Sequence, residues 1–398
     1  MALDAFKPQF DNAYQEVFQR TLVAKDIMNT RFESVLKYGA SIARVSYDIS
    51  GVLVRTVTRG AAVTPDSVTD DSQTLLIEIE KEAVFHISDG EVTQAGPLNP
   101  GEVIGKQVGH KVALDLDGRC FAEIRNALYS FDNGDLTTGT STGTAITLNS
   151  TTVPQMTTRL GAKLRNKNNQ EVMTNMALVV DSYAASDVSQ FIISKNIDLA
   201  GAVFKNGYAG DVSSAQMYIS ENLPCDVVIT STGVVSDADT ITINGVVLTM
   251  KTTLGSTAGN ILIGANAAAT ITNLAAFLDA PTVTTAQGVA LTVAADIAAL
   301  KGIDGVATSA TVLTLNGTGT GRIIVTESLT NFVVTSTTLL CYYGKKGAID
   351  LVIQDLSPVD MRKTADRRGT NVFSSYLAGI KTFSDGAKKF LQVKILVA

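Results

Sequence analysis

The 398-residue sequence predicts an α+β protein that carries a second, β-rich domain inserted into the first. Three observations support this prediction. Apolar and polar residues alternate almost strictly over residues 75–87, which indicates a long strand with one buried face. Apolar residues recur every four positions from Ile104 to Leu128, which indicates one unusually long helix. Between residues 226 and 340, Thr, Gly and Ala dominate and charged residues become rare, which marks a different domain.

Composition narrows the class of protein. Hydrophobic residues make up 45% of the chain and charged residues 18%, as in folded proteins. The formal charge of -6 disfavours a dedicated nucleic-acid binder, because such domains are usually basic. The sequence has no apolar run of about 18 residues and no signal-peptide pattern at its start, so we expect folding in a cytoplasm without a membrane span.

The first elements are an N-terminal helical region and a β-rich arm. Apolar spacing over residues 8–38 predicts an amphipathic helix or helix pair that ends at Gly39. Residues 52–90 predict a long two-stranded arm, with Glu78, Glu80 and Glu82 on its wet face. A lone hairpin is marginally stable in water, so we expect the arm to rest on another surface, such as a second subunit.

The long helix follows the arm. Asn99 is its predicted N-cap and Pro100 its first residue, and the pattern ends near Asp132, giving a length of about 45 Å. Gly105 and Gly109 either allow another backbone to approach closely or simply weaken the helix, and we favour the second interpretation. The predicted elements after it are a flexible Thr/Gly linker at 133–154, a helix at 155–169, a strand and helix at 176–192, a strand at 215–224, and closing strands in 347–356 and 376–398.

The inserted domain has turn signals of its own. Asn244-Gly245 predicts a tight hairpin, residues 267–280 predict a helix, and residues 311–328 predict a second hairpin. Insertions are tolerated at exposed loops, so the two ends of the insert should lie close together. Cys225 and Cys341 bracket the insert, and the sequence leaves open whether they are two buried thiols or a disulfide.

The sequence predicts no catalytic, cofactor or metal site. His86 and His110 stand outside any zinc-binding spacing, and no nucleophile motif occurs. The glycines of residues 316–322 do not fit a nucleotide fingerprint, because a strand rather than a helix is predicted after them. The basic residues Arg362, Lys363, Arg367 and Arg368 suit a solvated loop, or a contact with nucleic acid or an acidic neighbour.

In their order along the chain, several segments resemble the major capsid proteins of tailed bacteriophages, which have the HK97-type fold. The resemblance covers most of residues 8–225 and 341–398. The matching segments are 56–91, which looks like the family's extended loop, 100–131, which looks like its spine helix, 176–192 with 206–224, which resemble its axial domain, and 374–398, which is similar to its terminal strands. Members of this group often carry an inserted domain.

The resemblance implies a division of the whole chain into domains. The expected parts are an N-terminal arm (1–50), an extended loop (51–95), a peripheral domain with the spine helix (96–165), the first part of an axial domain (166–225), the insert (226–340), the return of the axial domain (341–356) and the closing strands of the peripheral domain (357–398).

The resemblance also implies a function. The chain would assemble with itself as hexamers and pentamers into an icosahedral head that encloses phage DNA, with formation in the bacterial cytoplasm and a final place in the virion. A separate scaffolding protein and a portal are implied, decoration proteins are compatible, and contact with the packaged double-stranded DNA would be non-specific. The expected inter-subunit contacts are Arg59, Glu78, Glu80, Glu82, Arg367 and Arg368.

Three other functions compete with this interpretation. An encapsulin-like shell around a cargo enzyme has the same fold, but the insert and the N-terminal arm argue against it. The Thr/Gly-rich hairpins would suit a secreted adhesin or surface-layer protein, but the sequence shows no signal-peptide pattern. A hydrolase is disfavoured because the sequence offers no nucleophile paired with a base.

Overall fold

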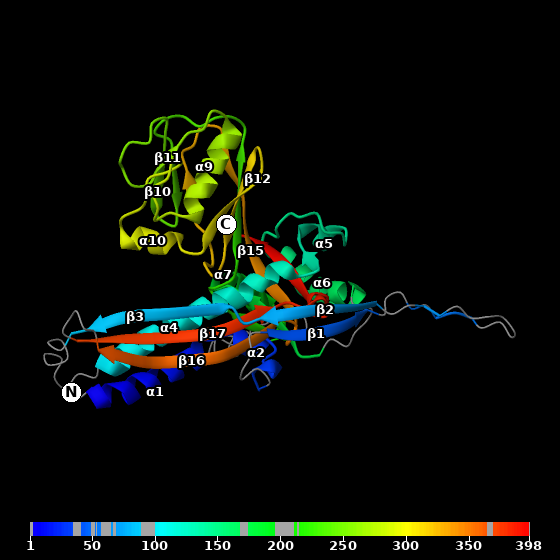
Figure 1. Ribbon diagram of the computed structural model, residues 1–398. Helices are drawn as coiled ribbons and strands as arrows, with labels where there is room; N and C mark the ends of the chain where they lie inside the picture. Colours follow the sequence, from blue (N-terminus) through cyan, green and yellow to red (C-terminus); the bar gives the residue numbers. More distant parts are fainter. Residues whose placement is uncertain are drawn as a thin grey trace. The chain divides into compact units, whose positions relative to one another are not determined.

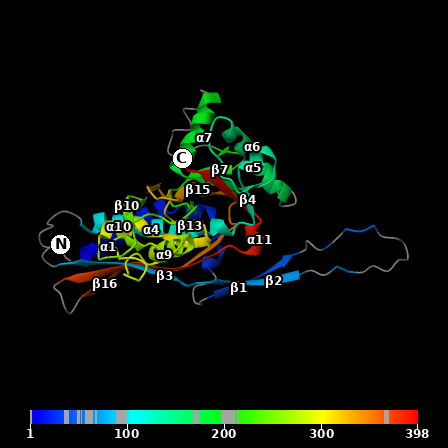
Figure 2. The ribbon, with the colours of Figure 1, turned by 90° about the horizontal axis from the view of Figure 1, so that it is seen from above.

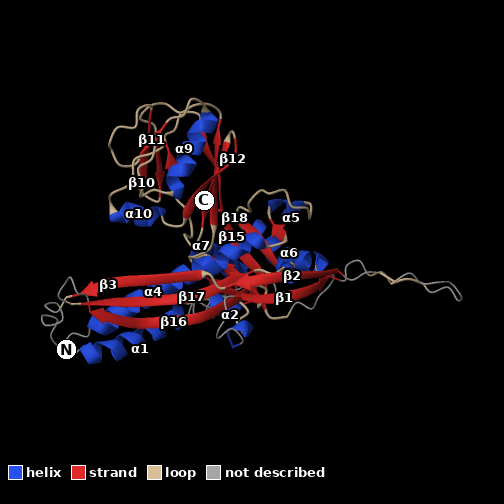
Figure 3. Ribbon diagram, viewed as in Figure 1, coloured by secondary structure: helices blue, strands red, loops and turns tan. Residues whose placement is uncertain are grey.

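The computed structural model describes residues 3–34, 41–48, 52, 54–56, 65–66, 69–88, 100–167, 174–195, 211–212, 215–363 and 369–397. It confirms the α+β class (Figures 1 and 3). Residue contacts divide the chain into two compact units, which we describe separately. Unit 1 contains Met1–Thr21, Lys25–Ala113 and Lys346–Lys389, and unit 2 contains Leu22–Ala24, Leu114–Lys345 and Phe390–Ala398.

Unit 1 is built on a three-stranded antiparallel sheet in the order β16-β17-β3. Helix α1 packs on this sheet, because the rings of Phe10 and Phe85 stack with their centroids 6.0 Å apart. The strands are β1 (Ser41–Asp48), β2 (Thr69–Leu76), β3 (Ile79–Ile87), β16 (Asp350–Lys363) and β17 (Thr370–Lys381); the helices are α1 (Leu3–Thr21), α2 (Ala24–Ile27), η1 (Arg31–Ser34) and α11 (Ser384–Ala387).

The alternating segment is shared between two sheets. β2 pairs with β1, with Leu76 opposite Ser41, whereas β3 pairs with β17, with Ile79 opposite Ala378. The predicted two-stranded arm over 52–90 is therefore wrong in its extent: the described hairpin is β1–β2, and β3 belongs to the three-stranded sheet. The predicted faces are right, since Leu75 is fully buried whereas the three glutamates are exposed. Alternation sets the face of each side chain, but not the partner of each strand.

Helix α4 (Pro100–Ala122) is shorter than predicted, about 35 Å. It continues into a 3-10 turn, η2 (Glu123–Asn126), and strand β4 (Tyr129–Phe131). The predicted cap, Asn99, lies outside the described residues. A Cβ at Gly105 would lie 2.6 Å from the carbonyl oxygen of Phe10, and one at Gly109 would lie 2.7 Å from that of Tyr14. Our preferred interpretation of the two glycines was wrong, because they let α1 lie directly against α4.

Unit 2 contains a nine-stranded mixed sheet with the main order β12-β13-β8-β15-β5-β7-β6, to which β18 and β4 are attached. Figure 2 shows α5, α6 and α7 beside β4 and β7. The remaining strands are β5 (Met176–Val180), β6 (Asp211–Val212), β7 (Ala215–Ile219), β8 (Cys225–Ser231), β12 (Ile303–Ser309), β13 (Val312–Gly317), β15 (Phe332–Lys345) and β18 (Phe390–Leu396); the helices are α5 (Asn133–Thr137), α6 (Thr152–Lys167) and α7 (Ser182–Lys195).

The segment predicted as a flexible linker is ordered. Asp132 is buried and caps α5, and Asp135 completes the capping box. The Asp132 carboxylate also accepts hydrogen bonds from the backbone N–H groups of Thr142 and Gly143, at 3.1 and 2.7 Å. The prediction was wrong because Thr and Gly composition indicates a loop, whereas one buried carboxylate gives that loop a fixed shape.

The insert combines a second sheet with strands of the first. Its four-stranded sheet has the order β11-β10-β9-β14, and its elements are β9 (Thr240–Ile243), β10 (Val246–Lys251), β11 (Asn260–Leu262), α9 (Ala267–Asp279), α10 (Ala294–Leu300) and β14 (Val325–Glu327). The predicted hairpin at Asn244-Gly245 is confirmed, with both residues at positive φ, 49° and 87°. The second predicted hairpin is wrong, because β13 and β14 lie in different sheets.

The two ends of the insert are paired, as predicted. Strand β8 leads into it and β15 leads out, and the two form an antiparallel ladder from Cys225–Leu339 to Ser231–Phe332. Strand β15 then continues beyond the insert, where it pairs with β5 and β18. The insert and the sheet that carries it therefore share one continuous strand of 14 residues.

Candidate assembly surfaces

The hairpin β1–β2 is a two-stranded sheet in the described part of the chain. Further along, the side chains of Arg55 and Asp66 still meet at 2.6 Å, so the two limbs remain together past the last described backbone pair, Asp48–Thr69. Val54 is fully exposed and Leu76 is 51% exposed. Apolar side chains on a two-stranded ribbon have little to pack against, so this hairpin is a surface suited to contact with another chain.

Buried charge anchors the base of the hairpin. The Arg44 guanidinium in β1 lies between the carboxylates of Asp350 and Asp385, at 3.2 and 2.6 Å, and 5.1 Å from the centroid of the Phe383 ring. Asp350 is 1% exposed and also accepts a hydrogen bond from the Asn29 side chain. Burial raises the pKa of Asp350, and Asn29 and Arg44 oppose that rise by stabilising the ionised form.

A second strand is held at the same place. The Ser384 N–H donates to the Gln73 side chain at 3.0 Å, and Lys381 Nζ donates to the Thr74 carbonyl at 2.7 Å. These hydrogen bonds join β2 to the end of β17 and to the start of α11. The base of the hairpin is thus fixed through both of its strands within unit 1.

The predicted contact residues fall into two groups. Glu80 and Glu82 lie on β3 opposite Leu377 and Ser375 of β17, and Glu78 immediately precedes the strand. All three glutamates are exposed, so they form one row of negative charge on the sheet. Arg59, Arg367 and Arg368 lie outside the described residues, and the structure does not test their predicted role.

The glycine-rich loop 317–322 connects the insert to the rest of unit 2. A Cβ on Gly319 would lie 2.8 Å from the Cα of Gly118 in α4, and one on Gly321 would lie 2.2 Å from the Glu221 carbonyl oxygen. Both glycines have positive φ. Sequence reasoning considered these glycines only as a nucleotide-binding motif and missed this contact. The sequence feature that could have indicated the contact is the recurrence of glycine at every second position. Glycine has no Cβ, so another backbone can approach its Cα closely.

Ion pairs surround this loop. Arg322 pairs through Nε with Asp181, which is fully buried, and its guanidinium lies 4.6 Å from the centroid of the Tyr183 ring. The Asp181 carboxylate also accepts a 2.9 Å hydrogen bond from Ala184 N–H at the start of α7. Arg125 pairs with Asp226 and donates to the Gly317 carbonyl at 3.0 Å. These contacts fix the insert on the sheet and on two helices.

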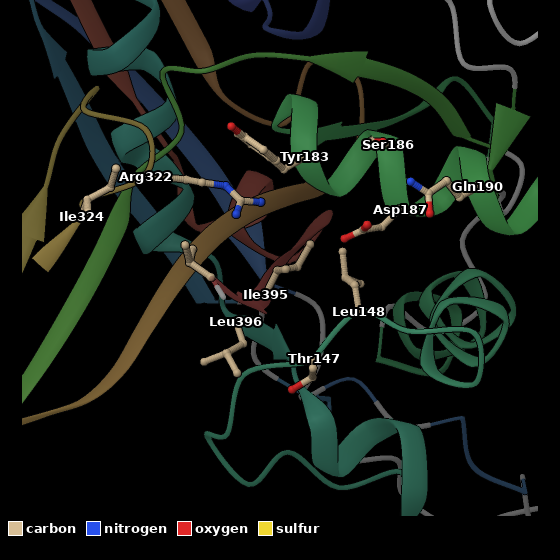
Figure 4. A pocket seen from close by; sticks show the side chains of 11 residues that line it. Thr147, Leu148, Tyr183, Ser186, Asp187, Gln190, Arg322, Ile324, Ile395 and Leu396 are labelled. Atoms are coloured by element: carbon tan, nitrogen blue, oxygen red, sulfur yellow. The ribbon is translucent and has the colours of Figure 1, made fainter. Parts of the chain in front are cut away.

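A pocket of about 500 Å³ opens beside Arg322 (Figure 4). Tyr183 and Asp187 of α7, Ile395 and Leu396 of β18, and Ile324 of the insert are among the residues that line it. Tyr183 and Ile324 are each 66% exposed. The pocket mixes exposed apolar side chains with one cation and one carboxylate, and it holds no nucleophile paired with a base.

The described residues offer little chemistry beyond packing. No group of three or more His, Cys, Asp or Glu residues among them is arranged to hold a metal ion. His86 Nδ1 is 2.8 Å from the Asn371 side-chain oxygen on the neighbouring strand, and His110 is exposed on α4. Among the described helices, none combines the length and the apolar character that crossing a membrane requires.

No protein-family model and no curated protein matches the sequence. Solved structures with a similar arrangement include one of Mycobacterium phage Che8, with a TM-score of 0.49 and 13% identity, where the match covers 93% of this chain and 90% of that chain. The capsid structure of cyanophage P-SCSP1u has a TM-score of 0.46 and 11% identity, covering 91% and 84%. The capsid of Ralstonia phage GP4 has a TM-score of 0.46 and 7% identity, covering 93% and 87%.

Proposed function

We propose that the chain is the shell-forming subunit of a phage or phage-like particle, a major capsid protein of the HK97-type fold, and that it is not an enzyme. In its assembled form it is part of the capsid shell of the virion. The elements support this proposal in their order along the chain: an N-terminal helix, a projecting hairpin, a long helix, a sheet with flanking helices, and closing strands. These are the parts that the resemblance of the sequence implies.

The observation that carries the proposal is the anchored hairpin. Its base is held by the Arg44–Asp350 pair and by Gln73, while the fully exposed Val54 lies beyond the β1–β2 ladder, and no third strand pairs with that ladder in the described chain. Such a hairpin gains stability when it lies on another surface. A second copy of the same chain supplies that surface in a closed, symmetric shell.

The domain assignment is part of the proposal. Residues 51–95 serve as the extended loop, and residues 96–165 and 357–398 form the peripheral domain. Residues 166–225 and 341–356 form the axial domain around which hexamers and pentamers assemble. Residues 226–340 form the insert, which stabilises the subunit or contacts its neighbours. Scaffolding, portal and decoration proteins are further proposed partners.

Negative-stain electron microscopy of the full chain, expressed alone and with its neighbouring gene products, tests the proposal. We expect polyhedral shells, tubes or hexameric capsomers, with shells dependent on a scaffold if the chain alone gives only capsomers. A monodisperse monomer in every co-expression would contradict the proposal.

Charge reversal then tests the contact residues. Arg59→Glu, and separately Glu78→Lys with Glu80→Lys and Glu82→Lys, should reduce the yield of shells, because both changes reverse charge on proposed inter-subunit surfaces. The monomer should melt at an unchanged temperature, since the three glutamates are exposed. Reversal of Lys106, an exposed residue of α4 that is not among the proposed contacts, is the control, and a normal shell yield from the Arg59 or the glutamate variant would remove those residues from the interface.

An encapsulin-like shell is the alternative within the same fold. It would enclose a cargo enzyme rather than DNA. Particles purified from the native source distinguish the two, because the capsid proposal expects nuclease-protected DNA and the alternative expects a co-purifying enzyme.

A further inference from the structure

We infer that the exposed face of helix α6 in unit 2 binds the phosphate backbone of double-stranded DNA without sequence preference. The inference rests on the proposed function, because a shell subunit encloses the genome. The chain is acidic overall, with a formal charge of -6. Helix α6 carries four cations and no acidic residue within 16 positions. The four are Arg159, Lys163, Arg165 and Lys167.

The apolar side of α6 fixes which side chains remain outside. The buried side chains of α6, which lie within unit 2, are Val153, Met156, Leu160 and Leu164. Arg159, Arg165 and Lys167 are exposed, whereas Lys163 is half-buried. From Arg159 to Lys167 the helix rises about 12 Å, a length over which duplex DNA presents about seven phosphate charges. Arg159 and Lys167 are eight residues apart and about 80° apart around the helix, so both can meet phosphates of one duplex, whereas Arg165 lies at least about 120° from either and faces another side.

A shallow pocket of about 240 Å³ lies beside this face. Arg159, Lys163, Asn166 and Lys167 line it from α6, and Asp135 is the acidic residue in its wall. The Asp135 carboxylate is 2% exposed; it pairs with Lys163 Nζ at 2.5 Å and accepts from Ser141 at 3.0 Å. Its charge is directed to Lys163, so Arg159 and Lys167 keep the pocket positive.

The contacts around the pocket hold the cations in place. Arg159 donates one hydrogen bond to the Asp135 carbonyl at 2.9 Å, which leaves other guanidinium N–H groups for a ligand. Lys167 Nζ lies 5.9 Å from the centroid of the Tyr129 ring. Cations of this kind bind phosphate oxygens, which position a duplex but carry no sequence information. Two such contacts give weak binding that salt reverses.

Anisotropy of a fluorescein-labelled 30-base-pair duplex, titrated with the full chain, tests the inference. With two phosphates neutralised, the slope of log K against log salt should be about -1.8, which is about a 12-fold loss of affinity between 50 and 200 mM salt. The variant Arg159→Gln/Lys167→Gln should bring this slope close to zero. Lys163 is retained, because its pairing with buried Asp135 supports the fold.

The control variant removes the same charge elsewhere. Lys251→Gln/Lys301→Gln changes one half-exposed and one exposed lysine outside α6 and should keep the slope of the unmodified protein. The inference would be overturned if the α6 variant kept the salt slope of the unmodified protein, or if the control variant lost as much of that slope as the α6 variant does. Equal affinity for polyglutamate would assign the face to an acidic protein instead. If shells form but the α6 substitutions leave the salt slope unchanged, this inference fails while the proposed function stands. If no shells form, the proposed function itself fails.

Discussion

At the scale of single residues, the three cysteines are buried thiols rather than reactive ones. Cys120, Cys225 and Cys341 are unbonded and have no exposed surface. Burial raises the pKa of Cys225 to about 11 and holds the pKa values of Cys120 and Cys341 well above the ordinary value. At pH 8, about one Cys225 thiol in a thousand is then ionised, and the thiolate is the reactive form.

We therefore expect no reaction with Ellman's reagent in the folded protein and three thiols per chain in denaturant. One thiol in denaturant would mean that Cys225 and Cys341 form a disulfide after all. The stability that Cys225 gains as a neutral thiol is present below pH 9, its unfolded pKa, and is lost as the pH rises towards 11. Cys225→Ala should flatten that part of the stability curve in calorimetry.

Arg44 is the residue on which the base of the hairpin depends. Arg44→Ala leaves the Asp350 carboxylate, 1% exposed, without its cation. We expect a loss of about 2 kcal/mol in the free energy of unfolding at pH 7, below the value for a fully buried pair because Arg44 is one-third exposed. Urea denaturation measures this change.

The loss should shrink as the solution becomes acidic. The pKa of Asp350 is raised in the folded protein, chiefly by burial, and removal of Arg44 raises it further. Protonation then relieves the unpaired charge, so the destabilisation grows as the pH rises through that pKa and is smallest below it. Arg362→Ala is the control, since its partner Asp360 is a surface residue and its own side chain is 71% exposed. Equal losses for both variants at every pH would show that Asp350 is not held by Arg44.

At the scale of elements, the loop 317–322 determines how firmly the insert is held. Gly319→Ala places a methyl group 2.8 Å from the Gly118 Cα and strains a positive φ of 65°. Gly139→Ala strains a similar φ of 76° but meets nothing within 4 Å. We expect Gly319→Ala to lower the free energy of unfolding by about 1–3 kcal/mol more than Gly139→Ala, because only the first also forces two backbones apart. Equal melting temperatures for the two variants would mean that this contact is loose.

Local patterns predicted elements well and their partners poorly. The hairpin at Asn244-Gly245 and helix α9 (Ala267–Asp279) follow from residues within one short segment, so a turn signal and a helical period were sufficient. The division of the alternating segment at Ile77-Glu78 depends on β17, almost 300 residues later in the chain. No local pattern carries that pairing.

The candidate surfaces show the same limit. The exposed row Glu78, Glu80 and Glu82 was predictable, because period-two alternation sets the face of a strand. The Arg44–Asp350 and Arg322–Asp181 pairs were not, because each joins residues more than 140 positions apart. Gly105 and Gly319 look like flexible positions in the sequence, and only the backbone that approaches them shows why glycine is needed.

At the scale of the whole molecule, strand β15 connects residues 226–340, the proposed insert, to the adjoining sheet. A domain tethered by two loops would unfold independently of its host. Here β15 pairs with β8 in its first half and with β5 and β18 in its second half, so the insert and the adjoining sheet exchange hydrogen bonds along one strand. The Arg322–Asp181 pair and the glycine contacts add to this connection.

We therefore expect the insert and the rest of unit 2 to melt in a single calorimetric transition. Deleting residues 227–339 should lower the soluble yield and the melting temperature, since it removes most of β8, the first half of β15 and the cation of buried Asp181. Unchanged soluble yield and unchanged shells would show that the insert serves neither folding nor contacts between subunits.

The combination Gly319→Ala/Arg322→Ala separates the two causes of this cooperativity. It removes the loop contacts but leaves the β8–β15 ladder intact. If the ladder couples the two parts, the variant melts at a lower temperature but still in one transition. If the loop contacts couple them, the transition divides in two, with the insert retaining its own midpoint. Two transitions in the unmodified protein would contradict both forms of the prediction. They would mean that one end of β15 unfolds while the other stays paired, whereas both forms assume that the two ends unfold together.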